Sequence, residues 1–141
     1  MEVTTNITQT DIYEDVYVIT GQTAKALKEM DLVSATEDED NVLSPFFKEA
    51  AAELSEIISS YGSLTVRGND ILITFQLPSN WKESVKNSLD AAIHNFITNS
   101  VCAKWFAMTN RPDMQYYQGK IASNTTNIIK LLCEKSKPTR T

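Results

Sequence analysis

The chain has 141 residues and a formal net charge of −5; 42% of its residues are hydrophobic and 22% are charged. This composition is ordinary for a globular protein, and the length predicts one domain that buries roughly 68% of its unfolded surface. The acidic balance argues against a general nucleic-acid-binding protein, which needs an excess of lysine and arginine to neutralise phosphates. We therefore expect protein partners.

The sequence shows neither a secretory signal nor an apolar run near the ~20 residues that span a bilayer, so we expect no membrane association. Cys102 and Cys133 are too few for a disulfide framework or a zinc site. The simplest expectation is synthesis in a reducing cytosol, with both thiols free.

We predict a single domain over residues 1–141. The periodicity of hydrophobic residues is weakest in its N-terminal segment, residues 1–44. Ile12, Val16 and Ile19 share one helical face and predict a helix over 11–19, although residues 16–20 also have strand propensity. The acidic stretch 31–41 predicts a loop without the ligand alternation or central glycine of a calcium-binding EF-hand. We expect a solvated negative patch for a basic neighbour, or charges at a helix N-terminus. Its residues are Glu37, Asp38, Glu39 and Asp40.

Apolar residues at alternating steps of three and four predict a helix over 45–61. They are Leu43, Phe47, Ala50, Leu54, Ile57 and Tyr61. Ser44 and Pro45 suit the cap and the first position of this helix, and Gly62 suits its end. A capping box of Thr36 and Glu39 would instead start the helix near residue 37 and make the proline a kink. We favour the later start.

Residues 64–77 change to a period of two and predict a two-stranded antiparallel β-hairpin. A two-residue turn at 68–69 would pair Val66 with Ile71. The next pair would be Leu64 and Ile73, so the apolar residues of both strands share one face. Because an isolated hairpin is marginal in water, that face must lie on the helices or on another chain.

The next helix is predicted over 81–108, after Pro78 ends the hairpin. Asn80 and Glu83 match a capping box at its start. One apolar stripe begins in its first turns, and the C-terminal half adds a second stripe that includes Trp105. Two stripes predict burial on two sides, either inside the domain or against a partner.

The last helix is predicted over 113–135, where apolar residues again recur at steps of three and four. The segment 104–117 (KWFAMTNRPDMQYY) joins the two helices. Only residues 109–111 separate the two patterns, which is the length of an antiparallel αα-hairpin loop. Pro112 suits the first helical position, and Asp113 complements the positive end of the helix. We therefore interpret the aromatic residues of this segment as packing at a joint.

Catalysis has little support in the sequence. His94 is the single histidine, and Asp90 lies one turn before it, as in some catalytic pairs. The same spacing is also that of an ordinary surface pair on a helix. Neither a neighbouring nucleophile nor an oxyanion loop is visible, and the scattered glycines build no phosphate-binding loop. We expect no enzymatic activity, no cofactor and no metal.

Together these elements predict a mainly α protein, a bundle of three to four helices with an inserted two-stranded hairpin at 64–77. The core would span 45–135 and be followed by a basic tail over 136–141. The predicted core residues are Phe47, Leu54, Ile57, Tyr61, Phe96, Trp105, Phe106, Tyr117, Ile121 and Ile128. Pro138 prevents the helix from continuing, so the C-terminal cations could dock on a neighbour's acidic patch. These cations are Lys135, Lys137 and Arg140.

Four motifs of the second half carry a resemblance: 77–81 (LPSNW), Trp105-Phe106, the helix that begins near Tyr116-Tyr117, and 135–140 (KSKPTR). Through them, about residues 37–141 resemble small virion proteins of tailed bacteriophages and prophages of gut bacteria, including the crAss-like group. The motifs consist mostly of packing and capping residues.

Such proteins look like head-to-tail connector, adaptor or neck components, whose small helical subunits form a ring beneath the portal and part of the DNA channel. The resemblance implies a homo-oligomeric ring in the virion after synthesis in the host cytoplasm. It also implies contacts with the portal and with other neck or tail proteins, DNA only as passing cargo, and no catalytic residue. The alternative is a small α-helical protein-interaction or regulatory module that binds one partner.

Overall fold

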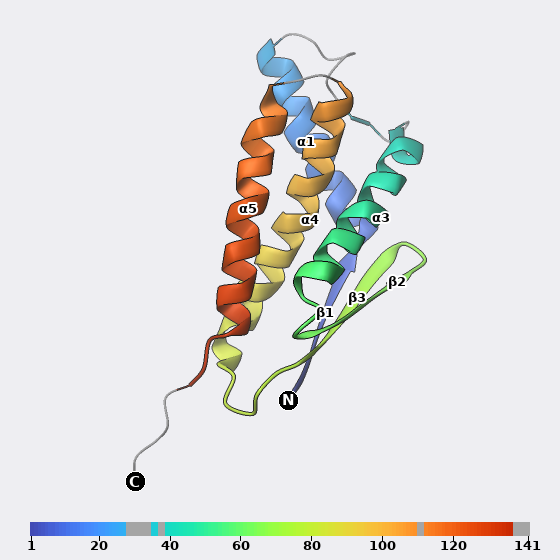
Figure 1. Cartoon of the computed structure of the whole chain (residues 1–141). Coiled ribbons are helices and arrows are strands. Elements are labelled where there is room, and N and C mark those ends of the chain that lie inside the picture. Colours follow the sequence, from blue (N-terminus) through green and yellow to red (C-terminus); the bar gives the residue numbers. More distant parts are fainter. Residues whose placement is uncertain (28–34, 37–38, 110–111, 137–141) are drawn as a thin grey trace.

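In the computed structural model, the described residues are 1–27, 35–36, 39–109 and 112–136. The elements follow the chain from the N-terminal strand to two long C-terminal helices (Figure 1). They are β1 (Glu2–Thr8), α1 (Gln9–Leu27), α3 (Asp40–Ile57), β2 (Gly62–Arg67), β3 (Asp70–Gln76), the 3-10 turn Glu83–Val85, α4 (Lys86–Met108) and α5 (Asp113–Leu132). The mainly helical prediction is confirmed. A small sheet lies at one end of the helices.

The sheet has three antiparallel strands in the order β1-β3-β2. The predicted hairpin register is confirmed, because Val66 pairs with Ile71 and Leu64 with Ile73. The φ of Gly68 is 58°, a left-handed value that a tight hairpin turn needs and that glycine adopts without strain. The predicted two-stranded hairpin is present but is not the whole sheet, since β1 adds a third strand along β3.

β1 follows the period of two that a half-buried strand requires. Val3, Thr5 and Ile7 are buried, whereas the intervening residues 4 and 6 are exposed. The hydroxyl of Thr5 donates a hydrogen bond of 2.7 Å to Asp90 of α4, which satisfies a polar group in this buried row. The strand was absent from the sequence prediction.

The helix predicted over 11–19 is confirmed and extends over Gln9–Leu27. The favoured start of the next helix at residue 45 is wrong, because α3 begins at Asp40 and contains Pro45. This proline removes a hydrogen bond to the carbonyl of Asn41, an exposed residue whose carbonyl can bind water. The predicted end at residue 61 is also late, since α3 ends at Ile57.

Gly62 opens β2 and does not terminate the helix. A Cβ at this position would lie 2.2 Å from the carbonyl oxygen of Thr74 on β3. No side chain fits at that distance, so glycine lets the two strands approach each other. The residue is required by the sheet.

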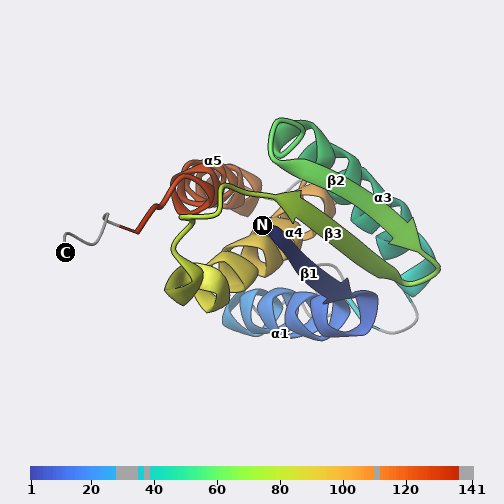
Figure 2. The ribbon, with the colours of Figure 1, turned by 90° about the horizontal axis from the view of Figure 1, so that it is seen from below.

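α4 is the central helix, with α1, α3 and α5 around it (Figure 2). The predicted capping box of Asn80 and Glu83 does not form, because a 3-10 turn precedes the helix and Lys86 is its first residue. Both apolar stripes of α4 are buried within the chain, except for Met108 at the last position of the helix, which is 51% exposed. Of the two possibilities left open for these stripes, burial inside the domain is the one that the structure shows.

α5 packs mainly on α4 as an antiparallel αα-hairpin, and it ends at Leu132, three residues before the predicted end. The rings of Phe106 and Tyr117 stack with centroids 5.4 Å apart near the joint, as predicted for this segment. Arg111 lies outside the described residues. All ten predicted core residues belong to the core or its edge. The half-buried ones are Ile57, Tyr61, Tyr117 and Ile121.

Candidate interaction surface

The predicted docking tail is anchored further along the chain than expected. Trp81 is 3% exposed, and its indole Nε1 donates a hydrogen bond of 2.9 Å to the carbonyl of Leu131. The same residue forms an isolated β-bridge with Lys135, and Ser136 donates a backbone hydrogen bond of 2.7 Å to Asn80. The chain is therefore held through residue 136, although the side chain of Lys135 is exposed. Lys137 and Arg140 lie outside the described residues.

The described acidic residues Glu39 and Asp40 lie at the N-terminal end of α3, and Glu37 and Asp38 lie outside the described residues. Asp40 accepts a hydrogen bond from the hydroxyl of Tyr17 on α1. Of the two interpretations left open, the charges at a helix N-terminus fit this residue. This end of α3 and the segment that follows α5 lie at opposite ends of the molecule (Figure 1), so a contact between them needs two subunits.

The predicted pair of His94 with Asp90 is wrong. His94 Nε2 lies 2.5 Å from a carboxylate oxygen of Asp15 on α1. Asp90 is already engaged, because Lys86 binds it at 2.6 Å and Thr5 at 2.7 Å. The histidine therefore joins α4 to α1.

The two cysteines are free, as predicted. Cys102 is buried, and this burial raises the pKa of its thiol to about 12. Cys133 is exposed, with its Sγ 3.3 Å from the hydroxyl of Tyr61, and this hydrogen bond raises the pKa of the tyrosine.

Three consecutive polar residues of α4, Thr98, Asn99 and Ser100, are buried and were not singled out from the sequence. Their exposed fractions are 4%, 9% and 1%. Asn99 donates a hydrogen bond of 2.8 Å to Asn124 on α5. The hydroxyls of Thr98 and Ser100 have no hydrogen-bond partner among the described residues. Since buried polar groups are nearly always paired, these hydroxyls need an explanation.

Each of these hydroxyl-bearing residues lines a groove beside α5. The α3–α5 groove has a volume of about 270 Å³ and is lined by Ser100, Ala103, Lys104, Ala107, Met114 and Ile121, among others. The α1–α5 groove, of about 380 Å³, includes Asp15, Thr98, Asn99, Lys120 and Asn124. α5 thus sits on α4 with a groove on each flank.

The outward surface of α5 carries little charge. Its 20 residues include three charged ones, Asp113, Lys120 and Lys130, whereas the 18 residues of α3 include five. Most other exposed positions are uncharged polar residues, together with Tyr116, which is 62% exposed. Interfaces between proteins are depleted of lysine and carboxylates and enriched in tyrosine, so this surface is suited to contact another protein.

No protein-family model, no curated protein and no solved structure matches this chain. Within the described ranges, no helix is long and apolar enough to cross a membrane. In the same part of the chain, no group of three or more histidine, cysteine or carboxylate side chains is placed to hold a metal ion.

Proposed function

We propose that this chain is a structural protein of a tailed-phage virion, a head-to-tail connector subunit that docks on the portal as part of a ring. The observation that carries the proposal is the outward surface of α5, which is poor in charge and bears the exposed Tyr116. A ring subunit needs such surface for its neighbours. The motifs of residues 37–141 that resemble phage neck proteins supply the biological setting.

The charge of the chain supports a role beside passing DNA. At a net charge of −5, the subunit has no excess of cations to hold phosphates. A channel built from such subunits would let DNA slide through without binding it tightly. DNA is therefore cargo in this proposal.

A second candidate is a small helical module that binds one protein partner outside the virion. The same uncharged surface of α5 favours this candidate, since it is suited to any protein partner. The two candidates differ in where the chain is found and in how many copies of it each complex contains.

The test is quantitative mass spectrometry of purified particles of the phage whose genome encodes the chain. A connector is expected in fixed stoichiometry to the portal, and deletion of its gene should give filled heads without tails. If the chain is abundant in infected cells but absent from particles, the connector function is wrong and the single-partner module is favoured. The control is particles of a phage that lacks an unrelated gene whose product is not part of the virion.

A further inference from the structure

We infer that the α3–α5 groove receives Tyr116 from a second copy of this chain. This inference rests on the proposed function, because it names the contact by which neighbouring subunits of the ring would meet.

The groove is suited to an aromatic side chain with a polar tip. Ala103 and Ala107 keep its α4 side open, and Met114 and Ile121 form an apolar wall on α5. Glu53, Lys104 and Gln118 supply polar groups to the same lining. A phenol ring would cover the apolar lining, and its hydroxyl would meet these polar side chains.

Tyr116 is such a side chain and is held outward. Its ring packs edge-on against that of Tyr117, with centroids 5.2 Å apart. The Nζ of Lys120 lies 4.7 Å from the centre of the Tyr116 ring. These contacts limit the motion of a ring that is 62% exposed, which lowers the entropy lost when it binds.

The charges around the two features are complementary. Lys104 lies beside the groove, 2.6 Å from Glu53 and 3.6 Å from Glu49. One cation and two carboxylates leave a negative rim. Lys120 lies beside Tyr116 on α5, so a bound Tyr116 would bring a positive charge to that rim.

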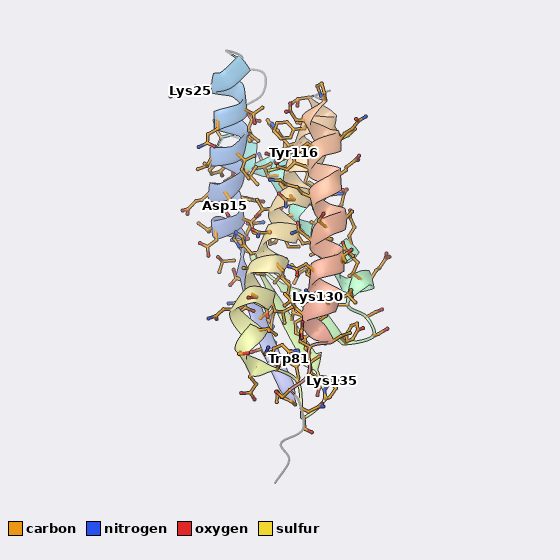
Figure 3. All side chains as sticks on the ribbon, turned by 90° about the vertical axis from the view of Figure 1, so that its left-hand side faces the viewer. Asp15, Lys25, Trp81, Tyr116, Lys130 and Lys135 are labelled. Carbon is orange, nitrogen blue, oxygen red and sulfur yellow. The ribbon has the colours of Figure 1, made fainter. Side chains whose placement is uncertain are left out.

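The two features lie on opposite flanks of α5. At 3.6 residues per turn, Met114 and Ile121 of the groove lie nearly opposite Tyr116 and Lys120 around the helix axis. Tyr116 lies on the α1 side of α5 (Figure 3). A contact between two different faces is heterologous, so it can repeat from copy to copy and close into a ring.

The test is cross-linking of the full chain at millimolar concentration, in a Cys133→Ser background that removes the exposed thiol. Ala107→Cys marks the groove and Gly119→Cys marks the helix beside the tyrosine. When the two variants are mixed and mildly oxidised, we expect a dimer that neither variant forms alone. The chain with both substitutions should give a ladder of oligomers. A control mixture replaces Ala107→Cys with Val18→Cys, an exposed position on α1, and should give little cross-link.

Tyr116→Ala in the same background should reduce the cross-linked yield at least tenfold, while its melting temperature stays close to that of the parent. Tyr116→Phe keeps the ring and should retain part of the yield. Absence of the mixed dimer, equal yield with Val18→Cys, or a dominant dimer of Gly119→Cys with itself would each overturn the contact. If the chain is present in virions at ring stoichiometry without this cross-link, the contact is wrong and the connector function stands. If the cross-link forms but the chain is absent from virions, the reverse holds.

Discussion

At the scale of single residues, burial controls the acid–base chemistry of Cys102. Its thiolate would lie in the core, so desolvation raises the thiol pKa from 9.0 to about 12, with a smaller contribution from Asp15. Burial likewise raises the pKa of Tyr117 from 10.0 to about 12. Both side chains therefore keep their protons in the folded state at pH values where the unfolded chain loses them.

We predict a loss of stability in alkaline solution that depends on Cys102. Below pH 9 the thiol is protonated in both states, and between pH 9 and 12 only the folded state keeps the proton, so stability falls as the pH rises. One proton contributes at most ~1.4 kcal/mol per pH unit. Melting temperatures from pH 7 to 11 should fall less steeply above pH 9 for Cys102→Ala. The exposed-site control Val18→Ala should keep the parent slope, and an unchanged slope in Cys102→Ala would contradict the assignment.

Substitutions of Trp81 measure how much this side chain stabilises the end of α5. Trp81→Ala removes a large buried aromatic group and should lower the free energy of unfolding by about 3–5 kcal/mol. Trp81→Phe keeps most of the volume but loses the hydrogen bond to Leu131, so it should cost about 1–3 kcal/mol. Urea denaturation measures both, with Val18→Ala as an exposed control. Equal losses for the alanine and phenylalanine variants would mean that the hydrogen bond dominates.

At the scale of elements, the sequence predicts best where the signal is local. The register of the β2–β3 hairpin follows from a two-residue turn and from alternation within fourteen residues, and the structure confirms it. β1 also alternates, but Thr5 occupies the middle of its buried row, which weakens the apolar pattern. Its pairing with β3 spans more than sixty residues, and no local pattern reports such a contact.

The start of α3 was missed for a different reason. Pro45 is a strong local signal for a helix start, whereas the structure tolerates it inside the helix because the carbonyl it leaves free belongs to exposed Asn41. The partner of His94 was missed because its choice depends on which helix lies alongside α4. Spacing along α4 suggests Asp90 as the partner of His94, whereas the contact of His94 with Asp15 depends on the packing of α1 against α4.

Alanine substitutions at Gly62 and Gly119 should have opposite effects on stability. Gly62→Ala would place a Cβ 2.2 Å from a backbone oxygen of β3, so the strands must separate and stability should fall by more than ~1 kcal/mol. Gly119→Ala in α5 meets nothing within 4 Å and should raise stability by about 0.5–1 kcal/mol. Denaturant midpoints measure both variants. A stabilising Gly62→Ala would show that the close β2–β3 approach is wrong.

At the scale of the whole molecule, nearly all of the apolar surface of α4 is buried inside the chain. α1, α3, α5 and the sheet cover it, and the exposed large hydrophobic residues are few and scattered among the described ones. The proposed ring therefore cannot depend on a large exposed apolar surface among the described residues. In the proposed ring, neighbouring subunits would meet through surfaces such as the flanks of α5, which are polar, poor in charge and grooved. Associations through such surfaces are weak singly and become strong when a ring closes.

Backbone hydrogen bonds near the C-terminus determine the expected effect of shortening it. Glu134 and Ser136 make backbone hydrogen bonds to Lys82 and Asn80. Removal of residues 137–141 leaves these bonds in place, so the free energy of unfolding should stay within about 0.5 kcal/mol of the full chain. Removal of 133–141 breaks both bonds and should cost about 1–3 kcal/mol.

If the cations at 137 and 140 dock on a neighbour, the shorter truncation should nevertheless weaken incorporation into particles, and more so at high salt. Denaturation curves give the stability of both truncations, and mass spectrometry of virions gives the incorporation. A Lys137→Gln/Arg140→Gln chain of full length separates loss of charge from loss of length. Normal incorporation of both the truncated and the neutralised chain would remove the tail from the assembly mechanism, while leaving the contact through α5 to be judged by its own cross-link.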